Sequence, residues 1–300
     1  MKSGIDPEAR ILSVDNTALE LFRKCPMKFF WRIQNDLMPL GEAQAEHPSL
    51  ALHYGTAWHS ALDVLYKTKS VDSAKEQFED ATDGMEEDPY NKRTIGRGIR
   101  DLDEYVERYG DEIESLQLIE TEAHVRANVG QIIPPDGGDP WTLWYHGAID
   151  KIIKMDTGKI RIRDHKTTAS RSMHTATSYH LANQMLGYAH GVKNFFGIDD
   201  EVIVDVDIVV LAKVRETEFL RPEMRVDDAR LVDWSEGIIQ TGRMIVDCYN
   251  RNVFPQYGRE ACMAWGKQCE FFDLCDASKE MQPAIAQAQY TQKPWDPEER

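Results

Sequence analysis

The sequence predicts an α/β fold. Residues 54–67 and 226–250 have the apolar spacing of amphipathic helices, and residues 201–214 form a β-branched run that is typical of a buried strand. Residues 144–154 and 159–166 flank the sequence MDTG, which indicates a β-hairpin. Because helical segments precede and follow these strands in the chain, we expect helices and strands to share one core.

The first third of the chain is expected to be mostly helical. Residues 13–33 have the pattern of a helix followed by an aromatic segment, and Pro26 marks a turn or a new helix start. Residues from about 68 to 118 are charged and helical in pattern. We interpret this stretch as a helical insertion.

The elements from residue 119 onward complete the predicted fold. Residues 119–129 alternate loosely, as in a strand, and PPDGGDP at 134–140 is a turn. Residues 174–197 have the pattern of a helix. We expect a single domain over residues 1–280, followed by a flexible tail at 281–300 that is rich in Gln, Pro and Glu.

Length and composition indicate a globular protein. The chain has 300 residues, of which 42% are hydrophobic, and this is enough to bury a sizeable core. No apolar run reaches the roughly 20 residues of a membrane helix. The first ten residues, MKSGIDPEAR, lack the apolar stretch of a signal peptide. We therefore expect a soluble, cytoplasmic protein with no membrane partner.

The net charge of −16 bears on possible partners. Proteins that coat DNA non-specifically are usually basic, so the charge counts against that class. A local basic channel is still compatible with it, because salt confines electric fields to roughly 8–10 Å at physiological ionic strength.

The five cysteines indicate a metal centre. Cys262, Cys269 and Cys275 follow each other in the spacing C-x6-C-x5-C, and a fourth thiolate would come from Cys25 or Cys248. Cys25 lies at a turn among basic residues, whereas Cys248 lies inside a predicted helix, where a buried inert cysteine is expected. Spacing alone leaves zinc, an iron–sulfur cluster and ordinary core thiols open.

The predicted hairpin carries a second group of candidate site residues. Asp164 and Lys166 share one face of a strand, because strand side chains alternate, and His165 points to the other face. Asp150 lies on the neighbouring strand. Two carboxylates from paired strands can hold a divalent cation that activates water, although Asp-x-Lys at a strand end often means only a solvated edge.

Four short motifs, taken in order, carry a resemblance to a known family. They are Gly55-Thr-Ala-Trp-His59, Gly147-Ala-Ile-Asp150, Asp164-His-Lys166 and Gln184-Met-Leu-Gly-Tyr188. In this order, and within a frame of cysteines, they resemble the PD-(D/E)xK nucleases of the RecB-like branch that includes Cas4-type exonucleases. The resemblance extends from about residue 13 to 276. It implies a restriction-endonuclease-like core, which is a mixed central sheet flanked by helices.

The resemblance also implies roles for the motif residues. His59, Asp150, Asp164 and the backbone carbonyl of His165 would ligate Mg²⁺ or Mn²⁺. Asp150, Asp164 and Lys166 would be catalytic, with Lys166 positioning the attacking water. Gln184 and Tyr188 would contact the DNA backbone or support Lys166, and Thr167 would share this role.

Iron–sulfur members of this branch have one cysteine before the nuclease core and three after it. The resemblance therefore implies a [4Fe–4S] cluster held by Cys25, Cys262, Cys269 and Cys275. It would clamp the segments at about 20–32 and 258–278 together. The x5 interval matches the usual pattern, whereas the x6 interval is longer than the expected x2.

We expect a metal-dependent DNA nuclease, and specifically an exonuclease, acting in DNA processing, recombination or repair. One alternative is a DNA-binding subunit with little or no catalysis, which supports a helicase, a recombination protein or an integration complex. Another is a zinc-stabilised protein without a DNA role. The chain contains no P-loop and no His-Glu-x-x-His sequence that would indicate another enzyme class.

Overall fold

The computed structural model describes residues 4–43, 49–85, 92–169, 177–211 and 216–296. The chain divides into two compact units, each built from separate stretches of sequence. Unit 1 comprises Met1–Ala45, Val125–Gly147 and Ala229–Arg300, and unit 2 comprises Glu46–His124 and Ala148–Asp228. No helix within the described ranges is both long and apolar enough to span a bilayer.

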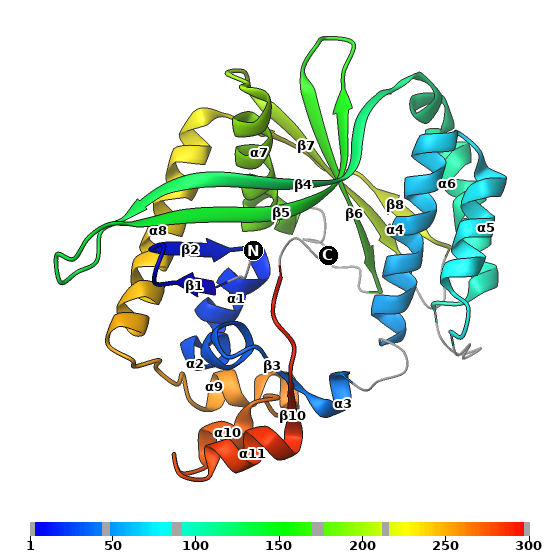
Figure 1. Cartoon of the computed structure of the whole chain (residues 1–300). Coiled ribbons are helices and arrows are strands. Elements are labelled where there is room, and N and C mark those ends of the chain that lie inside the picture. Colours follow the sequence, from blue (N-terminus) through cyan, green and yellow to red (C-terminus); the bar gives the residue numbers. More distant parts are fainter. Residues whose placement is uncertain (1–3, 44–48, 86–91, 170–176, 212–215, 297–300) are drawn as a thin grey trace. The chain divides into compact units, whose positions relative to one another are not determined.

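Strands β4 (Gln117–Ile132) and β5 (Trp141–Lys154) contribute residues to both units (Figure 1). The hydrogen-bonded order is β1-β2-β5-β6-β7-β8, with β4 on β5 and β9 on β7. Parallel and antiparallel pairs both occur, so the sheet is mixed. The prediction of an α/β fold with a mixed, helix-flanked sheet is therefore confirmed.

Among its described residues, unit 2 contains four strands besides its parts of β4 and β5. They are β6 (Ile160–Thr168), β7 (Val202–Val210), β8 (Glu218–Leu220) and β9 (Glu223–Val226). β6 pairs antiparallel with β5 and parallel with β7. All nine residues of β7 are buried, as the valine-rich sequence predicts for a central strand.

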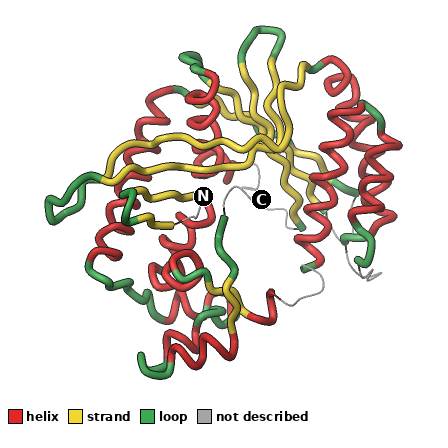
Figure 2. The backbone as a smooth tube through the Cα atoms, viewed as in Figure 1, coloured by secondary structure: helices red, strands yellow, loops and turns green. Residues whose placement is uncertain are grey.

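The helices of unit 2 are α4 (Leu50–Thr68), α5 (Val71–Ala81), α6 (Ile95–Ser115) and α7 (Asn183–Phe196), with a 3-10 turn at Thr177–Leu181. Ser49, Ser70 and Thr94 cap the first three through side-chain oxygens that accept backbone N–H bonds. The apolar face of α4 buries Tyr54 and Trp58 against Phe78 of α5. Figure 2 shows these helices beside the strands of the unit.

Unit 1 begins with β1 (Gly4–Asp6) and β2 (Ile11–Val14), which pair with each other, and β2 continues in parallel onto β5. Helices α1 (Asn16–Lys24) and α2 (Pro26–Phe29) follow, then a π-helical turn at Phe30–Gln34, β3 (Leu37–Pro39) and α3 (Leu40–Ala43). Pro26 is the first residue of α2, as predicted.

The long helix α8 (Asp228–Asn250) packs closely against strands of unit 1. A Cβ added at Gly242 would come within 2.6 Å of the Ile132 side chain, so the glycine permits this close approach. Tyr145 of β5 also packs edge-on against Trp234 of α8. Short helices α9 (Arg259–Cys262) and α10 (Phe272–Asp276) follow, separated by a 3-10 turn at Ala264–Gly266.

The segment predicted to be a flexible tail contains a helix and a strand, and its described residues end at 296. Residues Gln282–Gln289 form helix α11 and Tyr290–Gln292 form strand β10, which pairs antiparallel with β3. The Tyr290 ring stacks on Phe271 with centroids 5.5 Å apart. The polar composition did not indicate these contacts. They involve only one buried aromatic residue and three residue pairs between strands.

Candidate functional site

The first candidate site lies in unit 2, where β5 and β6 pair. Lys151 lies opposite Arg163 in the antiparallel register, and Asp150 and Asp164 come next to this pair. Both aspartates are buried. Strand alternation places their side chains on the face opposite Lys151 and Arg163. The pairing of the two strands therefore brings together two acids that are 14 positions apart.

Asp164 and Lys166 are in contact, as the strand periodicity predicted. Asp164 Oδ2 lies 2.8 Å from Lys166 Nζ. Burial raises the pKa of Asp164 to about 6; Lys166 opposes this rise and Asp150 reinforces it. Burial would lower the pKa of Lys166, but the two aspartates raise it overall. The ionised form of Asp164 is therefore favoured by Lys166 and disfavoured by burial and by Asp150.

His59 joins the group from helix α4. Its Nδ1 lies 3.4 Å from Asp150 Oδ2. Burial would lower the pKa of His59, but Asp150 raises it. One turn earlier, Gly55 faces β6, and a Cβ there would lie 3.3 Å from Thr167 Oγ1. The glycine of the Gly-x-x-x-His motif thus permits a close approach of α4 to β6. This approach places His59 beside Asp150.

Asp150 also accepts a backbone hydrogen bond from the strand beside it. The N–H of His165 donates to Asp150 Oδ2 over 2.6 Å. Burial alone would raise the pKa of Asp150, but His59, together with His165 and Lys166, lowers it well below its usual range. Asp150 is therefore ionised, and Asp164 is the more readily protonated of the two.

Gln184 and Tyr188 meet on helix α7. Gln184 Nε2 donates to the Tyr188 hydroxyl over 2.7 Å, as expected for residues four apart on one helix face. Among the described residues, no hydrogen bond or ion pair joins Gln184 to Asp150, Asp164 or Lys166. The predicted contact of Gln184 and Tyr188 with DNA stays a prediction.

The donor set suits a hard divalent cation. Two carboxylates, a carbonyl and an imidazole are ligands that Mg²⁺ and Mn²⁺ accept. Both acids are buried; Asp150 contacts His59, and Asp164 contacts Lys166. A bound cation would compete with these two contacts. Within the described ranges, no three His, Cys, Asp or Glu side chains surround one point closely enough to hold a metal ion as they stand.

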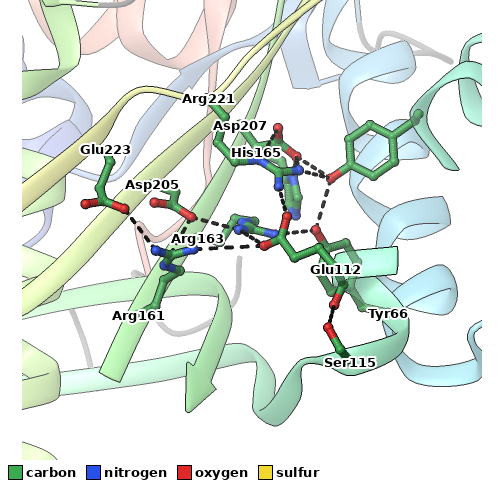
Figure 3. A network of polar contacts seen from close by, with 11 residues as sticks. Tyr66, Glu112, Ser115, Arg161, Arg163, His165, Asp205, Asp207, Arg221 and Glu223 are labelled. Carbon is green, nitrogen blue, oxygen red and sulfur yellow. Dashed lines mark hydrogen bonds and ion pairs between the residues drawn. The ribbon is translucent and has the colours of Figure 1, made fainter. Parts of the chain in front are cut away.

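A buried polar network on the other face of β6 was not predicted from the sequence (Figure 3). Its centre is Asp207 of β7, opposite His165 in the parallel register, with Asp205 opposite Arg163. The network also includes Tyr66, Tyr105, Glu112, Arg161, Arg221 and Glu223. Two acids spaced two apart in the apolar run VDVDIVV were the available signal.

The second candidate site lies in unit 1 and consists of cysteines. Cys25 lies between α1 and α2, Cys262 ends α9, Cys269 precedes α10 and Cys275 lies in α10. All four line one pocket. Cys248 lies on α8, outside the lining of that pocket.

Further contacts join the segments that carry these cysteines. Cys269 N donates to Cys262 O over 2.7 Å, and Met27 N donates to Pro255 O over 3.2 Å. Lys28 Nζ and Glu270 Oε1 form an ion pair at 2.7 Å beside the pocket. The segments around residues 25 and 270 are therefore held together next to the thiols.

The cysteines influence one another electrostatically. Burial raises the pKa of Cys275 to about 11, and the neighbouring Cys25, Cys269 and Cys262 contribute to this rise. Thiols that oppose each other's ionisation favour a cation, which stabilises the thiolates. The soft, four-sulfur donor set fits zinc or an iron–sulfur cluster in its chemistry.

Comparison with known proteins places the chain in a family. The model of the PD-(D/E)XK nuclease superfamily matches residues 13–276. No curated protein matches. One similar solved structure is a protein of Eubacterium rectale named "Putative exonuclease", with 14% identity, a TM-score of 0.47, and coverage of 90% of this chain and 91% of that one. Another is SSO0001, with 14% identity, a TM-score of 0.29, and coverage of 79% and 78%.

Neither structural likeness is close enough to support a conclusion about function. The family match, in contrast, spans most of the 300 residues. It includes the strands that carry Asp150, Asp164 and Lys166. The mixed sheet with flanking helices is consistent with a restriction-endonuclease-like core. The chain belongs to the PD-(D/E)XK nuclease superfamily.

Proposed function

We propose that the protein is a metal-dependent DNA nuclease, and specifically an exonuclease of the RecB-like, Cas4-type branch, which hydrolyses phosphodiester bonds. The observation that carries the proposal is the meeting of Asp150, Asp164, Lys166 and His59 in unit 2. A buried structural ion pair would need only one acid. Here two acids, a lysine and a histidine meet at a partly open point, since His59 is 30% and Lys166 27% exposed.

The proposed roles follow from the chemistry of each group. His59, Asp150, Asp164 and the backbone carbonyl of His165 would hold Mg²⁺ or Mn²⁺. Such a cation, when bound, supplies positive charge that neutralises a phosphate and favours ionisation of water. Lys166 would orient the attacking water and offset charge that develops on the phosphate. Gln184 and Tyr188 would bind the DNA backbone or support Lys166.

We further propose that the four cysteines hold a [4Fe–4S] cluster with a structural role. Four thiols around one pocket supply the usual ligand complement of such a cluster. The cluster would join the segment after α1 to the segment that contains α9 and α10, and so stabilise unit 1.

Cleavage assays with Asp150→Asn test the nuclease proposal. The substrates are end-labelled linear and circular single-stranded and double-stranded DNA, each with Mg²⁺, Mn²⁺ or chelator. We expect wild-type cleavage that requires the metal, requires free ends and falls at least about 100-fold in the variant. Asp156→Asn, an exposed aspartate in the hairpin turn, is the matched control.

The same assays identify the alternatives. Full activity in Asp150→Asn would show that the assignment of the site is wrong. Cleavage of circular substrates would exclude a strict exonuclease. Wild-type protein that binds DNA but leaves every substrate intact in both metals would replace the proposal with a binding subunit for a helicase or integration complex.

Iron and sulfide analysis of anaerobically purified protein tests the cluster. We expect about four iron and four sulfide per chain, and loss of both in Cys25→Ala. Cys248→Ala is the matched control, because this thiol lies outside the pocket lining. Colourless protein that contains one zinc ion would refute the iron–sulfur assignment.

A further inference from the structure

The side chain of His165 is buried on the face of β6 opposite Asp164 and Lys166. Its Nδ1 lies 3.1 Å from Asp207 Oδ2, and the two residues are paired in the parallel register of β6 and β7. Because an ionised carboxylate only accepts, Nδ1 carries the proton that is donated to Asp207.

Residues from two other segments of the chain also contact Asp207 (Figure 3). Arg221 Nε lies 3.0 Å from Asp207 Oδ1, and Arg221 Nη2 lies 3.2 Å from Oδ2. The hydroxyl of Tyr105, from α6, donates to the same carboxylate. Burial alone would raise the pKa of Asp207, but His165 and Arg221 lower it well below the usual range. The carboxylate is therefore ionised and fully engaged.

The backbone of His165 faces the candidate site. Its N–H donates to Asp150 Oδ2 over 2.6 Å, and its carbonyl is one of the proposed metal ligands. Fixing the His165 side chain therefore also fixes the peptide groups that position Asp150. Asp207 reaches the site only through His165, since its other described partners, Arg221 and Tyr105, belong to the network on the opposite face.

We propose that Asp207 is a positioning residue of the nuclease, which acts by locking the imidazole of His165 so that the backbone of residue 165 holds Asp150 in place. This inference rests on the proposed function. It extends the proposed metal site to Asp207 and the His165 side chain. The motif residues of β6, Asp164 and Lys166, lie on the other face of that strand. Residues that orient metal ligands through hydrogen bonds typically change metal affinity or activity by about 10–100-fold when they are replaced.

Asp205 provides a matched control on the same strand. It is also buried on β7, and it accepts from Arg163 over 2.7 Å, so it belongs to the same ionic network. It lies opposite Arg163, not His165, in the register. Asp205→Asn and Asp207→Asn each remove one buried charge, and both should lower the melting temperature. Only Asp207→Asn should loosen the hold on Asp150.

The measurement is Mn²⁺ affinity of the full chain without DNA, read from the EPR signal of free Mn²⁺, with melting temperatures recorded in parallel. We expect the Mn²⁺ dissociation constant to rise about 10–100-fold in Asp207→Asn and less than about threefold in Asp205→Asn. With labelled DNA, kcat should fall in Asp207→Asn while KM for DNA stays the same, because no DNA contact is removed.

A second pair of variants applies if Asp207→Asn does not fold. His165→Asn keeps a side-chain N–H near the place of Nδ1, whereas His165→Phe fills the space without a donor. His165→Asn should therefore lose much less Mn²⁺ affinity than His165→Phe. Equal losses of Mn²⁺ affinity in the two His165 variants would overturn this inference but not the proposed function. Equal losses in Asp205→Asn and Asp207→Asn would do the same. Wild-type protein whose Mn²⁺ binding equals that of Asp150→Asn would overturn the proposed function and the inference with it.

Discussion

Asp164 Oδ2 and Lys166 Nζ lie 2.8 Å apart on β6, and the aspartate is almost wholly buried whereas more than a quarter of the lysine side chain is exposed. The acid is thus buried, whereas part of the lysine side chain is open to solvent. Each partner of this pair depends on the other for charge compensation.

Replacing Lys166 by Ala should abolish most of the nuclease activity. We expect at least about a 100-fold loss in kcat, because the positioned ammonium is removed. Loss of the ammonium also removes the charge that opposes the raised pKa of Asp164, so that acid should become harder to ionise. The assay is metal-dependent release of label from single-stranded DNA.

Lys159→Ala is the control for this prediction. Lys159 lies at the other end of the hairpin, where its Nζ pairs with Glu201 at 2.6 Å. Partly exposed pairs of this kind contribute little to stability, so both activity and stability should stay near wild type. Equal losses in both variants would refute a specific role for Lys166.

Gly98 of α6 should not tolerate a side chain. A Cβ there would come within 2.2 Å of the Phe78 ring, which is buried in the core of unit 2. We expect Gly98→Ala to lower the free energy of unfolding by about 1–3 kcal/mol, as overpacked cores do. Urea denaturation followed by circular dichroism measures the change.

Gly96, two residues earlier on the same helix, has no atom near its Cβ position. Gly96→Ala should therefore leave stability unchanged or raise it by up to about 1 kcal/mol, since alanine is the better helix former. A loss in Gly96→Ala as large as that in Gly98→Ala would show that contact with Phe78 is not the cause.

The raised pKa of Asp101 predicts how the stability of the protein depends on pH. Burial raises its pKa from 3.8 to about 6, against the opposing effects of Thr217 and Arg97. Between these two pH values the folded chain binds the proton more tightly than the unfolded chain, so this residue lowers stability as pH rises through about 4 to 6. Asp101→Asn removes that titration.

Thermal melts of wild type and Asp101→Asn from pH 4 to 8 test this effect. The melting temperature of the wild type should fall relative to the variant as pH increases, and most of the change should be complete by about pH 7. Asp103→Asn, an exposed position on the same helix, should follow the wild type. Parallel curves for all three proteins would contradict the prediction.

Tyr290 anchors the C-terminal segment of unit 1. Its ring stacks on Phe271, and its hydroxyl donates to Glu270 O over 2.6 Å, next to Cys269. Tyr290→Ala should cost about 3–5 kcal/mol if the site does not collapse, as for buried aromatic residues elsewhere. It should also speed release of iron to a chelator, read from the absorbance of the protein.

Tyr290→Phe separates packing from hydrogen bonding. It retains the ring and loses only the hydroxyl, so we expect a cost of about 0.5–1.5 kcal/mol and iron release close to wild type. Unchanged stability in Tyr290→Ala would show that β10 contributes nothing to this part of the fold.

Features of short sequence range were predictable from the chain alone. Apolar periodicity located α4 and α8, because side-chain burial follows the helical repeat, and the β-branched run at 201–214 located β7. Alternation along β6 placed Asp164 and Lys166 on one face, and the structure confirms their contact. Helical spacing likewise predicted the meeting of Gln184 and Tyr188.

The helix predicted at 174–197 was located only in part. Residues 170–176 lie outside the described part, and the chain has a 3-10 turn at Thr177–Leu181 before α7 begins at Asn183. The polar composition of the segment from residue 281 likewise gave no indication of helix α11 or strand β10. Composition reports the average character of a segment, whereas one stacked ring and a strand pairing fixed residues 282–292.

By itself, the sequence determined which residues could share a strand or helix face, because that depends only on the local repeat of the backbone. The resemblance to a family also predicted which four cysteines form one site, and the structure places all four in the lining of one pocket. Only the tertiary structure decided that His59 reaches Asp150 and that Asp207 lies against His165. Those contacts join elements far apart in the chain, and their register is fixed by strand pairing and helix packing rather than by any local pattern.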